Sequence, residues 1–321
     1  MDAARDRWLP DLATIRAAQA RIAPHVHRTP VQTSHSLDAA TGATLFFKCE
    51  NLQKVGAFKA RGACNAVFSL PDADARRGVV THSSGNHGAA LAFAAQRRGI
   101  PAYVVMPDMA PKIKVANVEG FGAQVYFCAS TLAAREATCA QVVANTGGTL
   151  VHPYDDYDVI AGQGTAALEL LAEVGDLDAI IAPVGGGGLL SGTAIAAKGV
   201  APRITVLGAE PAGADDAARS FASGTLHAMP YPQTIADGLR GALSQRTMDA
   251  LRTHVAAIGT CSEGAIVAAM RLVWERMKIV IEPSSAVPLA AMLEANVPVA
   301  GKRVGVILTG GNVDLERLPW Q

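Results

Sequence analysis

Short apolar runs rich in β-branched residues alternate along this chain with alanine-rich amphipathic segments. The apolar runs have the length of buried strands, and the alanine-rich segments have helical spacing. Strands are predicted at residues 44–48, 78–82, 102–106, 124–128, 179–183, 205–210 and 304–309. Helices are predicted at residues 65–70, 89–98, 133–145, 162–174 and 189–198. This alternation is typical of parallel strands joined by helical crossovers, so the predicted fold class is α/β.

Composition narrows the function classes. The 321 residues are 50% hydrophobic and 17% charged, which predicts a globular protein of one or two domains. Twenty-eight basic residues balance 28 acidic ones without a basic block, so no nucleic-acid partner is expected. The charged N-terminus is unlike a secretory signal, and no run reaches membrane-spanning length, so no membrane partner is expected. The five cysteines form no Cys-x-x-Cys pair, which favours the reducing cytoplasm.

A loop rich in small polar residues follows the predicted strand 78–82 and precedes a helix. Its sequence is Ser83-Ser84-Gly85-Asn86-His87-Gly88. Ligands of open parallel sheets bind at the carboxyl ends of strands, and a helix N-terminus attracts anions. The loop therefore predicts a site for an anion such as a carboxylate, with an ordinary Ser/Asn helix cap as the alternative.

Four successive glycines, Gly185, Gly186, Gly187 and Gly188, follow the predicted strand 179–183 and precede a helix. Glycines let a backbone approach a phosphate closely and point N–H groups at its oxygens, so we predict a phosphate-binding loop. The Gly-Lys-Ser/Thr of a nucleoside-triphosphate loop is missing, and Ser191 stands where a dinucleotide fingerprint needs its third Gly or Ala. A tight turn without a ligand is the alternative.

Two further positions carry candidate chemistry. Thr309 ends the apolar strand near the C-terminus, where its hydroxyl faces either a ligand or a simple strand-end turn. Lys59 lies beside Phe58 among small residues. Such surroundings desolvate an amine and lower its pKa, as Schiff-base lysines require, although most lysines are solvated charges.

Taken together in this order, these segments resemble fold-type II pyridoxal-phosphate enzymes of the serine racemase and serine/threonine dehydratase group. The resemblance runs over nearly the whole chain, through residues 56–63, 81–88, 159–164, 183–188, 209–216, 234–238, 273–285 and 308–314. It implies a tryptophan synthase β-like fold with two open, twisted, mostly parallel sheets flanked by helices. The large domain would comprise residues 1–52 and 153–321, and the small domain residues 53–152. A homodimer is also implied.

The resemblance implies roles for the residues singled out above. Lys59 would form the covalent link to pyridoxal 5′-phosphate and serve as catalytic base, with Phe58 packed beside the ring. Residues Gly185 to Gly188 would bind the phosphate, Asn86 the ring hydroxyl, and Thr309 the pyridine nitrogen. A neutral hydroxyl at that nitrogen favours elimination over long-lived carbanion chemistry.

Substrate and metal contacts also follow from the resemblance. Ser83, Asn86 and His87 would hold the substrate carboxylate, joined by Arg135 unless that residue is a surface helix charge beside Glu136. Ala242 replaces the family's later substrate-contacting serine, which leaves the substrate open. A divalent cation, Mg²⁺ or else Ca²⁺ or Mn²⁺, would bind Glu210, the Ala214 carbonyl and Asp216. The alternative is a helix cap, because Asp215 and Asp216 precede an alanine run.

The expected activity is β-elimination of a small hydroxy amino acid to a 2-keto acid and ammonia. Serine, threonine, 3-hydroxyaspartate and phenylserine share the reacting core. Ser84 makes racemisation the alternative, because the family's racemases use a serine there on the ring face opposite the lysine. Two other classes stay open: a non-catalytic binding module on the same fold, and a dinucleotide-dependent oxidoreductase.

Overall fold

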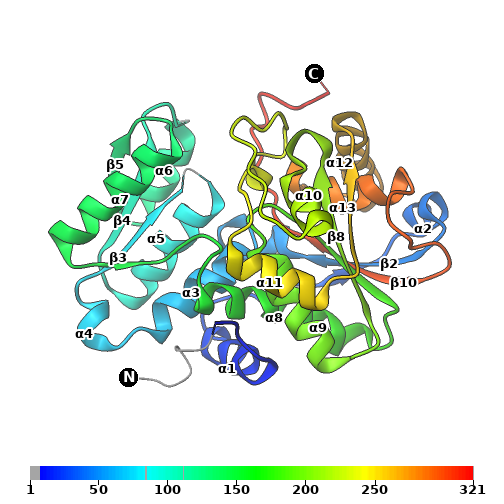
Figure 1. Ribbon diagram of the computed structural model, residues 1–321, viewed down its shortest axis with the longest axis horizontal. Helices are drawn as coiled ribbons and strands as arrows, with labels where there is room; N and C mark the ends of the chain where they lie inside the picture. The colour runs from blue at the N-terminus through cyan, green and yellow to red at the C-terminus, as the bar shows by residue number, and fades with distance from the viewer. Residues whose placement is uncertain (1–7, 84, 111, 321) are drawn as a thin grey trace.

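The computed structural model describes residues 8–83, 85–110 and 112–320, whose strands form two sheets (Figure 1). The larger sheet has the order β1-β2-β10-β7-β8-β9, and the smaller has the order β5-β4-β3-β6. The larger contains β1 (Val31–Gln32), β2 (Thr44–Cys49), β7 (Ala179–Pro183), β8 (Thr205–Pro211), β9 (Ala257–Cys261) and β10 (Arg303–Leu308). The smaller contains β3 (Val79–His82), β4 (Ala102–Pro107), β5 (Gln124–Cys128) and β6 (Thr149–Leu150).

Helices cover both faces of each sheet. Before the first strand of the smaller sheet come α1 (Leu12–Ile22), α2 (His35–Thr41), α3 (Lys59–Ser69) and α4 (Asp72–Ala75). Next come α5 (Asn86–Arg98), α6 (Lys112–Gly120), α7 (Leu132–Thr146), α8 (Tyr157–Val174) and α9 (Gly188–Val200). The rest are α10 (Asp216–Ser223), α11 (Gln245–His254), α12 (Glu263–Met277) and α13 (Pro283–Leu293). Single 3₁₀ turns are η1 (Glu50–Leu52), η2 (Lys54–Gly56), η3 (Ala212–Ala214) and η4 (Asp237–Leu239).

The larger sheet separates two hydrophobic cores, because alternate residues of its strands point to opposite faces. In β10, Val306 joins the core under α2, α12 and α13, whereas Ile307 joins the core under α1, α8, α9 and α11. Strand β10 pairs in parallel with both β2 and β7, so the last strand in sequence lies in the middle of the sheet. Only β1 among the described strands of this sheet pairs antiparallel.

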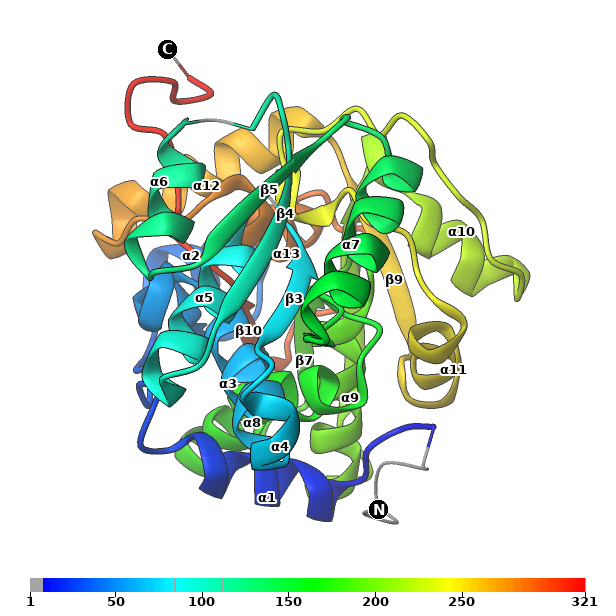
Figure 2. The same ribbon diagram turned by 90° about the vertical axis from the view of Figure 1, so that its left-hand side faces the viewer.

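The smaller sheet is entirely parallel in the described residues and forms a separate lobe (Figures 1 and 2). Val79 and Val104 face α3 and α5, while Val80 and Val105 face α7. Helix α3 lies between the two lobes (Figure 1). We propose that residues 53–152 form the small domain and that residues 1–52 and 153–321 form the large domain.

The predicted α/β fold is confirmed, and each predicted strand and helix overlaps an observed element. The ends agree to within three residues, except that α3 and α8 begin six and five residues before the predicted helices 65–70 and 162–174. The short helices α2, α4 and α10, the helices α1, α6 and α11 to α13, and strands β1, β6 and β9 were not predicted. Among the described helices, none combines the length and apolar character that crossing a membrane requires.

Candidate active site

Loops from both sheets meet where the parallel strands end. The loop after β3 reaches the C-terminal loop, because Asn312 Nδ2 donates to Asn86 Oδ1 at 2.9 Å. The segment before α3 joins the end of β10, since Phe58 N donates to Thr309 O at 2.9 Å. Strand ends collect ligand-binding groups in parallel sheets, so this junction is the candidate active site.

Lys59 begins α3 and points toward the loop after β6, where its Nζ donates to Pro153 O at 2.8 Å. The amine lies 5.1 Å from the Phe58 ring centroid. Burial lowers the pKa of Lys59 to about 8, and the nearby Glu282 acts in the opposite sense. A lysine with so lowered a pKa has a substantial neutral, nucleophilic fraction near neutral pH. This geometry agrees with the desolvated amine expected from the sequence.

The glycine loop forms a closely packed cradle at the N-terminus of α9. Gly187 has a φ of +86°, which favours glycine. A Cβ atom on Gly186 would lie 2.3 Å from the Tyr154 ring, and one on Gly185 would lie 2.9 Å from Leu239 Cα. Any larger residue would therefore collide with the loop's surroundings. Small residues at a helix N-terminus fit a bound phosphate.

Thr309 and Asn86 present polar groups to the same junction. The Thr309 side chain is buried, and its Oγ1 has no hydrogen-bond partner among the described residues. Asn86 Nδ2 donates to Glu282 Oε1 and Oε2 at 3.0 and 3.2 Å. Burial raises the pKa of Glu282 to about 7, and the neighbouring Asp237 adds to this effect. An unpaired buried hydroxyl is costly, which points to a ligand at Thr309.

Histidines gather beside Lys59. His152 lies between His82 and Tyr154, with ring centroids 5.4 and 4.6 Å away. Burial, followed by the charge of His82, lowers the pKa of His152 to about 4. His87 is buried with its Nε2 3.3 Å from Val151 O, and burial holds its pKa well below the ordinary value. These rings are therefore neutral at pH 7.

The remaining predicted substrate residues are less closely tied to the junction. Gly85 N donates to Ser83 Oγ at 3.2 Å, which is a local turn contact. Ser84 lies outside the described residues. Arg135 Nε donates to the carbonyl oxygen of Thr131, which precedes α7. Burial lowers the pKa of His82, and the charge of Arg135 lowers it further. Arg135 thus faces the site electrostatically without a direct contact to the predicted carboxylate group.

Ala242 follows Gly241, which lies against Tyr154. A Cβ atom on Gly241 would stand 3.5 Å from Tyr154 Cε1 and 3.9 Å from its hydroxyl. The phenol of Tyr154 therefore lies beside the residue that precedes Ala242.

The predicted cation ligands lie together at the end of β8. Glu210 accepts from Ala217 N and Ala218 N at 3.1 and 2.8 Å, so Glu210 caps α10 rather than the preceding aspartates. Asp216 Oδ2 is buried without a hydrogen-bond partner among the described residues. Burial raises the pKa of Glu210 to about 8 and of Asp216 to about 6. Two buried carboxylates with raised pKa values could hold a cation.

Sequence reasoning assigned no role to four residues of this site: Glu282, Asn312, His152 and Tyr154. Asn312 ends the glycine loop that follows the last predicted strand, but nothing in the sequence gives it a partner, and Glu282 is an isolated glutamate without a local signal. His152 and Tyr154 follow a strand of two residues, too short for periodicity to reveal.

Comparisons with known proteins show the family and the fold of this chain. Residues 22–310 match the family described as "Pyridoxal-phosphate dependent enzyme". The chain is 53% identical to a β-hydroxyaspartate dehydratase from Paracoccus denitrificans, covering 98% of this chain and 99% of the relative. It is 50% identical to a serine racemase from Arabidopsis thaliana, covering 99% and 98%. The solved structure of maize serine racemase superposes with a TM-score of 0.93 at 49% identity, covering 95% and 94%.

Proposed function

This chain belongs to the family of pyridoxal-phosphate dependent enzymes, and on that premise we propose that it eliminates the β-hydroxyl of a small hydroxy amino acid, giving a 2-keto acid and ammonia. The observation that carries the proposal is the partly buried Lys59 amine, with a pKa lowered to about 8, at a junction that also contains a glycine cradle and an unpaired buried hydroxyl.

The residues present fit pyridoxal 5′-phosphate. Lys59 would hold the cofactor covalently, with Phe58 beside its ring. Residues 185–188 would bind its phosphate through their backbone N–H groups. Their close packing leaves room only for glycine, so no side chain covers these groups. Asn86 would reach the ring hydroxyl, and the unpaired Thr309 hydroxyl would meet the ring nitrogen.

The bound cofactor supplies a conjugated ring that raises the acidity of the substrate's α-proton. Once the amine of the substrate has displaced it from the cofactor, Lys59 Nζ would take that proton, since a lowered pKa leaves part of the amine neutral. General-base catalysis of this kind contributes about two to four powers of ten in rate. The neutral histidines beside Lys59 do not repel its charged form. The β-hydroxyl would leave as water, so the proton taken up by Nζ balances the one that the leaving group needs.

Among hydroxy amino acids, 3-hydroxyaspartate is the favoured substrate. The relative from Paracoccus denitrificans named for that substrate is 53% identical over almost the full length of both chains. The Arg135 charge, which faces His82, is of the right sign for a second carboxylate. Serine and threonine are the other substrates to test.

The experiment is a visible absorbance spectrum of the purified protein, followed by keto acid and ammonia assays with 3-hydroxyaspartate, serine, threonine and phenylserine. Lys59→Ala is the control. We expect colour and keto acid in the wild type, and loss of both in the variant. If the wild type stayed colourless and inactive after pyridoxal 5′-phosphate was added, the proposal would be refuted and a non-catalytic binding module would be favoured.

Racemisation is the second candidate, because the Arabidopsis thaliana and maize relatives are named serine racemases. Ser84 would supply the proton on the ring face opposite Lys59. If Ser84→Ala kept any racemase activity intact while elimination persisted, this role would be wrong.

We also propose a Mg²⁺ (or Ca²⁺ or Mn²⁺) site at Glu210, the Ala214 carbonyl and Asp216, supported by the unpaired buried Asp216 Oδ2. Chelation should lower the melting temperature of the wild type but not that of Asp216→Asn. A homodimer in the cytoplasm completes the proposal. The five free cysteines are in line with that compartment, and light scattering tests the dimer.

A further inference from the structure

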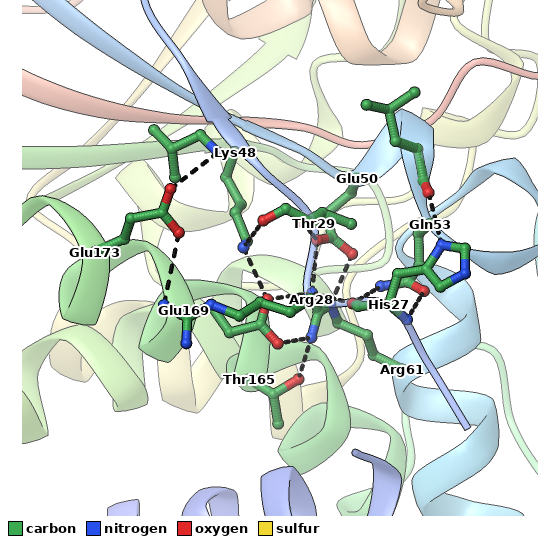
Figure 3. Close-up of polar contacts among 12 residues, drawn as sticks. His27, Arg28, Thr29, Lys48, Glu50, Gln53, Arg61, Thr165, Glu169 and Glu173 are labelled. Carbon is green, nitrogen blue, oxygen red and sulfur yellow. Dashed lines mark hydrogen bonds and ion pairs between the residues drawn. The ribbon is translucent and has the colours of Figure 1, made fainter. Parts of the chain in front are cut away.

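Four charged side chains are buried together beneath α3. Lys48, Glu50 and Arg61 are fully buried, and Glu169 is 8% exposed. Their formal charges cancel. Figure 3 shows Arg61 between the two carboxylates, with Lys48 reaching Glu169 from β2. Burying charges is costly unless each is paired, so such a cluster requires an explanation.

Arg61 uses its whole guanidinium group in this cluster. Its Nε and Nη2 donate to Glu50 Oε2 and Oε1 at 2.7 and 2.8 Å. Its Nη1 and Nη2 donate to Glu169 Oε1 and Oε2, both at 2.8 Å. A third side chain also accepts a hydrogen bond, since Nη1 donates to Thr165 Oγ1 at 3.2 Å. Paired contacts of this kind fix the orientation of a guanidinium as well as its position.

The cluster joins three parts of the fold at the first turn of α3. Glu50 follows β2, Glu169 lies on α8, and Arg61 is two residues beyond Lys59. A helix turns by about 200° over two residues, so Arg61 and Lys59 project from nearly opposite sides of α3. Holding Arg61 therefore sets the direction in which Lys59 points.

The same turn of α3 is pressed closely against α8. A Cβ atom on Gly162 would stand 2.6 Å from Gly62 Cα, and Gly62 N donates to Gln163 Oε1 at 3.1 Å. The two glycines fix how close the helices lie, whereas side-chain contacts oppose rotation of α3 about its own axis. The Arg61 contacts on both sides oppose that rotation.

The cluster does not act on Lys59 through charge. The pKa of Lys59 responds to burial first and to Glu282 second, rather than to Glu50 or Glu169. Well-packed hydrophobic residues would often be at least as stabilising as buried ions. What the ion cluster adds is a fixed geometry.

We propose that Arg61 is a positioning residue, which holds the first turn of α3 so that Lys59 Nζ can form its covalent bond to the cofactor. The proposal rests on the function proposed above. Two events take place in one pocket: binding of the cofactor's phosphate and ring, and capture of its aldehyde by the amine. Arg61 is needed for capture of the aldehyde and not for binding of the phosphate and ring.

The test compares two probes on the full-length protein freed of cofactor. Pyridoxal 5′-phosphate carries the aldehyde, whereas pyridoxine 5′-phosphate has the same ring and phosphate without it. Arg61→Lys keeps the charge and loses the paired contacts. Because a displacement of about 1 Å costs up to about a hundredfold in such reactions, we expect Arg61→Lys to capture pyridoxal 5′-phosphate at least tenfold more slowly. Its affinity for pyridoxine 5′-phosphate should be unchanged.

Matched variants separate positioning from general stability. Ile266→Ala removes a buried side chain from α12 in the other core of the large sheet, so it lowers the melting temperature without touching α3. It should capture pyridoxal 5′-phosphate and bind pyridoxine 5′-phosphate like the wild type. Thr165→Val removes one contact of Arg61 and should show a smaller form of the Arg61→Lys effect, which keeps the test decisive if Arg61→Lys fails to fold.

Borohydride reduction and peptide mass mapping report the adduct on Lys59 without any activity assay. If Arg61→Lys and Thr165→Val lowered the affinity for pyridoxine 5′-phosphate as much as the capture of pyridoxal 5′-phosphate, the proposal would be overturned, because the pocket itself would have changed. Unchanged capture in both variants would overturn it too. A wild type that neither captures pyridoxal 5′-phosphate nor binds pyridoxine 5′-phosphate refutes the proposed function. Normal capture of pyridoxal 5′-phosphate by wild type and variants alike refutes only the role of Arg61.

Discussion

Thr309→Val should change cofactor-free stability and cofactor affinity in opposite directions. Thr309 is 3% exposed, and its Oγ1 has no hydrogen-bond partner among the described residues. An unpaired buried hydroxyl costs about 1–3 kcal/mol, so valine should raise the free energy of unfolding of the cofactor-free protein by about 1 kcal/mol. With cofactor bound, valine leaves the ring nitrogen unpaired. A loss of about 1–2 kcal/mol weakens cofactor binding by about 5- to 30-fold.

Urea unfolding of the cofactor-free protein and fluorescence titration with pyridoxal 5′-phosphate measure the two effects. Thr193→Val is the matched control, since Thr193 is fully buried inside α9 and its Oγ1 also lacks a partner among the described residues. The control should gain stability and keep its affinity for the cofactor. Unchanged affinity in Thr309→Val would refute the contact with the ring nitrogen. A less stable cofactor-free Thr309→Val would mean that the hydroxyl is paired after all.

Three other substitutions test neighbouring features. Gly186→Ala should lower the free energy of unfolding by about 1–3 kcal/mol in urea, because its Cβ atom would lie 2.3 Å from the Tyr154 ring; no loss would mean that the ring moves freely. Burial raises the pKa of Glu282 to about 7, above its usual 4.5, so its contribution to stability is lost as pH rises through that range. Glu282 should therefore account for about 1–3 kcal/mol of the stability that the cofactor-free wild type loses between about pH 5 and pH 8. Glu210 and Asp216, whose pKa values are also raised, add to the same loss. Glu282→Gln should lose correspondingly less, and an unchanged loss would assign the slope to other groups. Lys114→Met breaks a 2.7 Å ion pair between Lys114 and Asp237, which joins the two lobes. Because the two side chains are 35% and 48% exposed, the pair is weak, and KM should rise less than about fivefold and only at low salt. A larger rise would mean that Lys114 contacts the substrate.

Local sequence patterns determined much of this protein. Apolar runs of strand length and alanine-rich helices predicted the α/β fold, because periodicity records which side of an element is buried. Glycine loops directly after strands predicted where ligand-binding groups lie, since parallel strands bring their carboxyl ends to one edge. Lys59 was found because its neighbours in sequence already indicate a desolvated amine. The resemblance to a known family added the expected partners of each loop.

Only the tertiary structure decided which distant residues meet. Strand β10 lies between β2 and β7, which brings Thr309 beside Phe58, and no local pattern encodes that order. The contact of Asn86 with Glu282 spans 196 residues, and that of Arg61 with Glu169 spans 108. The sequence alone does not reveal that a charged residue is buried, because its pairing depends on side chains that folding brings from other elements. The chain therefore predicts its chemistry locally, while the fold sets the geometry that the chemistry needs.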